Sequence, residues 1–391
     1  MELPERISQL PEYPFPRLRR LLDGESSGHR EIDLSIGEPR LGLPDWVGPR
    51  LAEAVAGFAH YPPNFGTEEL LQAIADWLSR RYGANVEPES GIVCLNGTRE
   101  GLFNASLALC SEQKNGSAPY ILIPNPFYPA YAAGAIAAGA IPCFVAAEQE
   151  TDFLPDFAAL PPAILNRTSL VFLCSPSNPQ GAVASLDYLK ELLALAERFG
   201  FRLLVDECYS EIYRMSPPTG ALQAAAAMNS DPETVVVFHS LSKRSGLPGL
   251  RSGFVAGGKG SIAAVKQLRT YGGAPIPTPL QMISEYAWRD EEHVKHNRAA
   301  FQDRYLAADE IMGGWKGYMS PRAGMFLWLD VGDGERVARQ LWRQSGLRVV
   351  PGEYFAHDVD GNNPGKQYIR VALTAEDEDL RTGLERLRAG I

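Results

Sequence analysis

One lysine, one aspartate and one arginine of this 391-residue chain stand where they could act on the same bound molecule. Asp206 lies in the apolar run FRLLVDE, and Lys243 and Arg251 follow the apolar run TVVVFHS. Such runs are typical of buried parallel strands, and ligands of parallel sheets bind beyond the carboxyl ends of the strands. A lysine amine forms Schiff bases with aldehydes, a buried carboxylate needs a cationic partner, and an arginine binds phosphate bidentately. These residue types indicate a site for a phosphorylated aldehyde cofactor.

Further groups that could bind such a cofactor also follow predicted strands, and they are Gly97-Thr98, Tyr128, Asn178, Tyr209 and the serines Ser240 and Ser242. The Gly97-Thr98 turn opens a predicted helix, whose free backbone N–H groups can hold a phosphate. Asn178 and Tyr209 can hydrogen-bond a phenolic oxygen. Each feature alone is more commonly structural: Asn178-Pro179 is an ordinary turn, and an isolated Lys243 would be a surface lysine. Their order along the chain favours pyridoxal phosphate, the common cofactor that needs this full set.

The elements that must position these groups alternate between apolar strands and amphipathic helices, which predicts an α/β fold with a mostly parallel seven-stranded sheet. The strands are expected at residues 91–96, 120–125, 141–146, 168–175, 201–207, 234–240 and 252–257. A helix such as 186–200 lies between two of them, with Gly200 as its expected C-cap.

The last hundred residues have a different pattern, with a helix at 300–312, strands at 324–331, 347–352 and 367–373, and a charged terminal helix. This pattern predicts a smaller α+β domain, on which the first 40 or so residues pack. The expected division is a large cofactor-binding domain at 46–287 and a small domain made of 1–45 and 288–391.

Composition limits the class of protein. Apolar residues make up 45% and charged residues 21%, which is ordinary for a soluble globular protein. A net charge of −10 argues against nucleic-acid binding. The most membrane-like run, 132–147, is shorter than a span and is expected to be an Ala-rich helix running into a strand.

Cysteine and histidine usage points to a cytoplasmic protein without a metal site. The five cysteines contain no CxxC pair and are expected to be free thiols of a reducing compartment, and the N-terminus lacks the apolar core of a signal peptide. His293 and His296 have no HExxH pattern and no evident third ligand, so we expect a polar helix face there.

The chain resembles the fold-type I, class I/II pyridoxal-phosphate-dependent aminotransferases over nearly its whole length. The matching motifs are SIGEP (35–39), Tyr61 with Gly66, NGTRE (96–100), NPFY (125–128), NPQG (178–181), DECY (206–209), SLSKRSGLPGLRSGF (240–254) and YIRVAL (368–373). The lysine segment, with its arginine eight residues later, is the most specific of these motifs.

The resemblance implies a role for each matching residue. Lys243 would carry the cofactor as a Schiff base, Asp206 would pair with the pyridine nitrogen, and Tyr209 would contact the phenolic oxygen; these three are the expected catalytic residues. Tyr128 would stack on the ring, where many members have Trp. The full set expected to bind the cofactor is Lys243, Asp206, Tyr209, Asn178, Tyr128, Gly97, Thr98, Arg99, Ser240, Ser242, Arg251 and Tyr61.

Substrate and partner are implied in the same way. Arg370 would clamp the substrate α-carboxylate, with the Gly37 backbone and Asn178 beside it. Independently of the resemblance, an arginine in the apolar run YIRVAL needs an anionic partner, which a core carboxylate could also supply. Family members are homodimers that share their active sites, and Tyr61 would reach the neighbouring subunit's phosphate.

A closer resemblance is to bacterial N-succinyldiaminopimelate aminotransferases of lysine biosynthesis, through YPFPRLRRLL (13–22), SIGEPR (35–40), NPFYPAY (125–131), DECYSEIY (206–213), SLSKRSGLPGLRSGFVAG (240–257) and GNNPGKQYIRVAL (361–373). The implied reaction moves an amino group between L-glutamate/2-oxoglutarate and N-succinyl-2-amino-6-oxopimelate/N-succinyl-LL-2,6-diaminopimelate. Gly272 departs from the subgroup, where His is expected. The candidates for binding the distal carboxylate are Arg40, Arg99, Arg244 and Arg322.

The sequence leaves other functions open. Within the cofactor class they are an aspartate- or alanine-type aminotransferase, a C–S lyase and a cyclopropane-forming synthase. Outside it, a cofactor-sensing regulator is disfavoured because only about 40 residues precede the first large-domain helix, too few for a DNA-binding domain. A nicotinamide dehydrogenase is disfavoured because no GxGxxG follows a strand.

Overall fold

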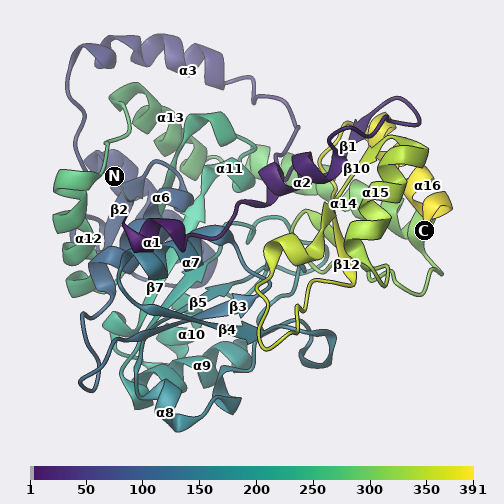
Figure 1. The fold of residues 1–391 in the computed structure, drawn as a ribbon. Helices are drawn as coiled ribbons and strands as arrows, with labels where there is room; N and C mark the ends of the chain where they lie inside the picture. The colour runs from purple at the N-terminus through teal and green to yellow at the C-terminus, as the bar shows by residue number, and fades with distance from the viewer. Residues whose placement is uncertain (1–3) are drawn as a thin grey trace.

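The computed structural model describes residues 4–391, and its centre is a seven-stranded sheet of order β2-β8-β7-β6-β5-β3-β4 (Figure 1). Its strands are β2 (Ile92–Leu95), β3 (Tyr120–Asn125), β4 (Ile141–Ala146), β5 (Thr168–Cys174), β6 (Arg202–Asp206), β7 (Val235–Ser240) and β8 (Gly253–Gly257). All neighbours pair in parallel except β8, which is antiparallel to both β2 and β7. The predicted fold class is therefore confirmed.

Helices cover both faces of this sheet and explain why its strands are apolar at consecutive positions. Along β6, Leu203 and Val205 belong to one core and Leu204 to another. The first core is closed by α4 (Glu68–Tyr82), α9 (Leu186–Phe199), α10 (Ala221–Met228) and α13 (Thr278–Arg289). The second is closed by α6 (Thr98–Leu109), α7 (Pro129–Ala137) and α12 (Lys259–Gly272). A strand covered on both sides has no polar face to present.

Local signals set the helix ends. The hydroxyl of Ser185 accepts a hydrogen bond from the backbone N–H of Tyr188 at the start of α9. Gly200, the expected C-cap, ends the helix in the left-handed conformation with φ of 65°. The expected Ala-rich helix running into a strand at 132–147 is α7 followed by β4.

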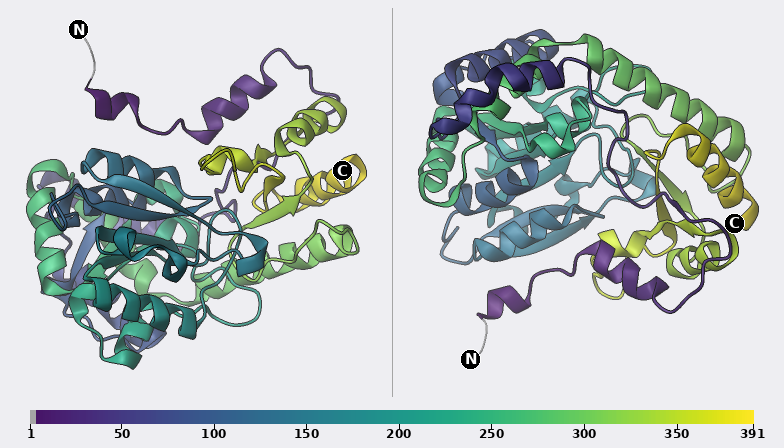
Figure 2. Two further views of the ribbon diagram at one scale, coloured as in Figure 1. Left: turned by 60° about the horizontal axis from the view of Figure 1, so that its bottom comes forward. Right: turned by 90° about the horizontal axis from the view of Figure 1, so that it is seen from above.

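The C-terminal hundred residues build a separate antiparallel sheet of order β11-β12-β9, from β9 (Phe326–Asp330), β11 (Val350–Pro351) and β12 (Tyr368–Ala372). Around it lie α14 (Glu292–Met312), α15 (Gly334–Ser345) and α16 (Asp377–Gly390). The N-terminal segment joins this part: β1 (Ile32–Asp33) pairs in parallel with β10 (Leu347–Arg348), and α2 (Pro14–Leu22) packs near β11 (Figure 2).

These parts share a core of their own, which includes Leu18, Leu34, Phe301, Leu327 and Leu384. We keep the division into 46–287 and 1–45 with 288–391 as a proposal. The start of α14 close to residue 288 supports it.

Shorter elements complete the chain: α1 (Glu5–Ser8), α3 (Val47–Ala54), α5 (Pro88–Gly91), α8 (Pro162–Leu165), α11 (Leu241–Arg244), and the 3-10 turns η1 (Val55–Ala59), η2 (Gln149–Thr151), η3 (Phe157–Ala159), η4 (Pro232–Thr234), η5 (Pro248–Leu250) and η6 (Gly352–Phe355). Within the described part of the chain, no helix has the length and apolar character that crossing a membrane requires.

Three sequence expectations differ from the structure. The strand expected at 347–352 is two short strands, because β10 pairs with β1 and β11 pairs with β12. The helix expected at 300–312 begins at Glu292. His293 is buried rather than on a polar face, since its two ring nitrogens lie 2.8 Å from Asp290 Oδ2 and 2.8 Å from Ser245 Oγ.

Candidate functional site

A cavity of about 300 Å³ lies at the carboxyl ends of β6 and β7 and reaches β12 of the C-terminal part. The predicted site residues that line it are Gly37, Thr98, Arg99, Tyr128, Asn178, Asp206, Tyr209, Ser240, Ser242, Lys243, Arg251 and Arg370. Gly97 stands directly before Thr98. Tyr61 does not line the cavity and is fully exposed.

Lys243 lies on the short helix α11, which directly follows β7. The Ser240 hydroxyl caps this helix by accepting a hydrogen bond of 3.1 Å from the Ser242 N–H. The Lys243 amine donates a hydrogen bond to the Gly37 carbonyl oxygen. Because the amine is withdrawn from water, its pKa falls to about 8, so more of it is neutral and nucleophilic near neutral pH than for an exposed lysine.

Asp206, the last residue of β6, carries a buried carboxylate whose described hydrogen-bond partners are both uncharged. One oxygen accepts from the Cys208 backbone N–H at 3.2 Å and the other from the Tyr131 hydroxyl at 2.9 Å. Burial raises the pKa of the Asp206 carboxyl, and these hydrogen bonds oppose the rise. A buried carboxylate at a cavity wall is stabilised by a cationic group in that cavity, such as a protonated ring nitrogen.

Tyr131 is a residue that the sequence reasoning missed. It lies on α7, fully buried, with its ring stacked on Phe172 at 4.5 Å between centroids. The spacing in NPFYPAY could have indicated it, because Tyr131 stands three residues after Tyr128 and residues three apart lie on the same face of a helix.

The opposite end of the cavity suits an anion. Gly97, at φ of 82°, precedes the first turn of α6, where backbone N–H groups are free. The Arg251 guanidinium lies against this turn and donates to the Asn96 carbonyl oxygen at 3.0 Å. A Cβ atom on residue 97 would lie 2.2 Å from Arg251 Nη2, so glycine is what permits this approach. Ser240 and Ser242 line the same cavity.

Arg370 enters from β12, buried, with its Cζ 4.2 Å from the ring centroids of both Phe326 and Phe355. It donates to Asn178 Oδ1 at 3.0 Å and to the Ser35 carbonyl oxygen at 2.7 Å. These partners are neutral, Nε has no partner within residues 4–391, and burial lowers the guanidinium pKa to about 10. Within residues 4–391, Arg370 does not form the internal ion pair considered from sequence, so no described carboxylate neutralises its charge.

The structure separates the four arginines proposed for a distal carboxylate. Arg99 lines the cavity, and it donates to the Tyr128 hydroxyl at 2.7 Å and to the Tyr13 hydroxyl at 3.0 Å. Arg244 is buried in the core and ion-paired with Glu291 at 2.8 Å. Arg40 and Arg322 are exposed and lie outside the cavity lining. Tyr13, from the N-terminal segment, was not singled out from sequence.

These features fit pyridoxal phosphate. The cavity offers a nucleophilic amine at Lys243, a buried carboxylate at Asp206 and an anion-binding end at Gly97 and Arg251. Gly272, the departure noted in the sequence, ends α12 with open space around it, so in the single chain it does not touch this cavity.

A family model described as aminotransferase class I and II matches residues 29–387. The LL-diaminopimelate aminotransferase of Dehalococcoides mccartyi is 31% identical, over 99% of this chain and 98% of that protein. A crystal structure of an aminotransferase from Neisseria meningitidis superposes with a TM-score of 0.94 at 37% identity, covering 99% of both chains. A probable N-succinyldiaminopimelate aminotransferase from Thermus thermophilus superposes with a TM-score of 0.83 at 27% identity, covering 96% of this chain and 100% of that one.

We expect Tyr131→Phe to weaken pyridoxal phosphate binding about tenfold or more, because a hydrogen bond to a charged group contributes about 1.5–3 kcal/mol. Asp206 would lose one of its two donors and become easier to protonate, so the loss should grow as the pH falls. The measurement is the cofactor dissociation constant between pH 6 and 9. Tyr188→Phe is the matched control, since that hydroxyl bonds the Pro155 carbonyl oxygen away from the cavity. Wild-type affinity in Tyr131→Phe would contradict the role.

Proposed function

Because the chain belongs to the class I and II aminotransferases, which are pyridoxal-phosphate-dependent, we propose that it moves an amino group between L-glutamate and a diaminopimelate-type substrate. The specific pair is N-succinyl-2-amino-6-oxopimelate and N-succinyl-LL-2,6-diaminopimelate. The observation that carries the proposal is Arg99, which lies in the cavity together with Arg370 and in addition to Arg251 at the anion-binding end. Two guanidinium groups suit substrates with two carboxylates.

Each cavity residue has a distinct task in this reaction. Pyridoxal phosphate, when bound, supplies an aldehyde that accepts the amino group and a ring that withdraws electrons from the substrate. Lys243 would hold the cofactor covalently through its amine, and the same amine, once displaced by the substrate, would move the proton from the substrate α-carbon to the aldehyde carbon of the cofactor. Asp206 keeps the ring nitrogen protonated, while Asn178 and Tyr209 hydrogen-bond the phenolic oxygen.

Binding and orientation are the tasks of the remaining residues. The first turn of α6 after Gly97, together with Ser240, Ser242 and Arg251, holds the phosphate group. Arg370 holds the α-carboxylate, and its contact with Asn178 fixes the guanidinium relative to the cofactor ring. Tyr128 covers the ring and at the same time positions Arg99.

The relatives favour one second candidate within the same reaction. The matching protein of Dehalococcoides mccartyi is named for LL-diaminopimelate, whereas the Thermus thermophilus structure is named for the N-succinyl form. Free LL-diaminopimelate is therefore the alternative substrate. Both molecules carry a carboxylate at the far end, which an alanine-type substrate lacks, and Arg99 argues against the alanine-type reading.

We also propose a homodimer, supported by apolar side chains on one segment. Leu43, Val55, Phe58 and Tyr61 are all more than half exposed, on or beside α3 and η1. Figure 1 shows α3 along the outer edge of the molecule. A second copy that covers this segment would remove these apolar side chains from water.

The substrate proposal is tested by mixing the purified holoprotein separately with L-glutamate, N-succinyl-LL-2,6-diaminopimelate, LL-2,6-diaminopimelate and L-alanine. We expect the first two to convert the cofactor to its amine form, with loss of the visible absorbance, and L-alanine to do so far more slowly. A response to LL-2,6-diaminopimelate instead of the N-succinyl form would select the second candidate. Lys243→Ala should show no conversion; a near-normal rate in that variant would overturn the assignment of the lysine.

Arg99→Gln should lower kcat/KM for the long dicarboxylic substrate by roughly 10- to 100-fold, the range for a charge-assisted hydrogen bond. Arg40→Gln, an exposed arginine outside the cavity lining, is the matched control and should leave kcat/KM unchanged. The same ratio for L-alanine should change little in either variant. An equal loss for both substrates would show that Arg99 does not bind the distal carboxylate.

A shared active site is tested by mixing two defective variants, Lys243→Ala and Tyr61→Ala. Mixed dimers contain one site with an intact Lys243 and an intact Tyr61 from the neighbour, so activity should return to about a quarter of the wild-type value. The variants alone provide the baselines. If the mixture sediments as a dimer but is no more active than the sum of the two variants, Tyr61 does not contribute to the neighbouring active site.

A further inference from the structure

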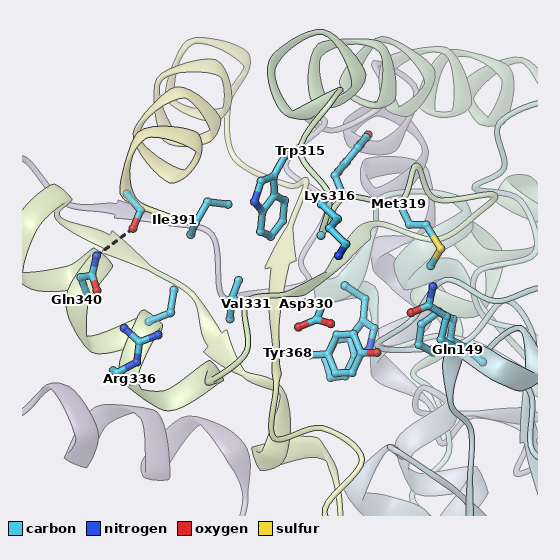
Figure 3. Close-up of a pocket in the computed structure, with 16 residues that line it drawn as sticks. Gln149, Trp315, Lys316, Met319, Asp330, Val331, Arg336, Gln340, Tyr368 and Ile391 are labelled. Carbon is cyan, nitrogen blue, oxygen red and sulfur yellow. Dashed lines mark hydrogen bonds between the residues drawn. The ribbon is translucent and has the colours of Figure 1, made fainter.

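A second cavity, of about 570 Å³, lies in the C-terminal part of the chain, between β9, β12, α15 and the segment that follows α14 (Figure 3). It is larger than the candidate active site and has the size of a small-molecule site. Within residues 4–391, it shares no lining residue with the candidate active site.

One wall of this cavity is aromatic. Trp328 and Tyr368 are buried and stacked on each other, with centroids 4.9 Å apart and an interplanar angle of 12°. Trp315, the Asp330 carboxylate and Tyr368 line the same cavity, and Figure 3 draws Asp330 in the region between the two labelled aromatic residues. Aromatic faces beside a carboxylate are a recurrent arrangement for ammonium groups.

The charges near this wall favour the same kind of group. Burial raises the pKa of the Tyr368 phenol, and the negative charges of Asp330, Glu150 and Glu148 raise it further. Asp330 accepts one hydrogen bond of 3.0 Å, from the Gly332 N–H to Oδ1. These three carboxylates favour a cation at the aromatic wall.

Two cationic side chains also line the cavity. Lys316 and Arg336 are both exposed, and the nearest carboxylate oxygen to Arg336 Nε, that of Asp333, is 4.0 Å away. Figure 3 draws Lys316 above Asp330 and Arg336 on the far side of Val331, so Arg336 is the group placed to bind a carboxylate away from Asp330. The cavity thus combines a place for an ammonium group with a place for a carboxylate.

We propose that this cavity binds a free basic amino acid, whose side-chain ammonium lies at Asp330 beside Trp315 and Tyr368 and whose carboxylate contacts Arg336 across the cavity. The bound molecule also touches Gln149 and Phe153, which precede β5, and Phe153 packs edge-on against Tyr368. The ligand therefore bridges the C-terminal part and the segment between β4 and β5. This site does not depend on the substrate proposed above.

The test is calorimetric titration of the holoprotein with L-lysine, cadaverine and L-norleucine, with the visible spectrum recorded in parallel. Cadaverine keeps the ammonium groups without the carboxylate, and norleucine keeps the carboxylate without the side-chain ammonium. We expect L-lysine to bind at least tenfold more tightly than either analogue, without a change in the cofactor spectrum, which reports the active site.

Asp330→Asn should weaken L-lysine binding at least tenfold, while amino transfer from L-glutamate stays unchanged and shows that the variant is folded. Asp303→Asn, an exposed aspartate on α14 outside the cavity, is the matched control. The proposal is overturned if L-lysine gives no heat of binding, if norleucine binds equally well, or if Asp330→Asn binds L-lysine as wild type. It is also overturned if all binding is accompanied by the spectral change of the active site.

Discussion

The site depends on two charged side chains that are buried away from water and have no opposite charge hydrogen-bonded to them. Asp206 and Arg370 are buried, and their described hydrogen-bond partners are neutral groups. Burial acts on both, raising the pKa of the carboxyl and lowering that of the guanidinium. Such an arrangement costs folding free energy unless a ligand supplies the missing charges. In the proposed reaction, a cofactor with a protonated ring and a substrate with a carboxylate would supply them.

The fold holds these groups at the required positions by joining two sheets at one cavity. Asp206 and Lys243 come from the ends of neighbouring parallel strands, and their backbones cannot move without disturbing the central sheet. Arg370 comes from the antiparallel sheet of the C-terminal part. The contact between Arg370 and Asn178 links the two. The relative position of the two sheets therefore decides whether the substrate lies over the cofactor.

Much of the fold could be predicted because parallel strands buried on both faces leave apolar runs in the sequence. The positions of Asp206 and Lys243 followed from the same logic, since groups after such strands meet at one sheet edge. Contacts between distant segments could not be predicted in this way. Arg99 donates a hydrogen bond to Tyr13, Asp206 accepts one from Tyr131, and His293 is hydrogen-bonded to Ser245. The partners in each pair are far apart in the sequence, so only the packed structure shows these contacts.

The pairing of β1 with β10 has a consequence for synthesis of the chain on the ribosome. Ile32 pairs with Leu347, so the first strand has its partner only after nearly the whole chain has been made. At ordinary translation rates this delay is on the order of tens of seconds. During that time Leu18, Leu34 and neighbouring apolar residues lack the core that later covers them. The central sheet can form first, and the N-terminal segment must be kept from aggregating until the last helices emerge.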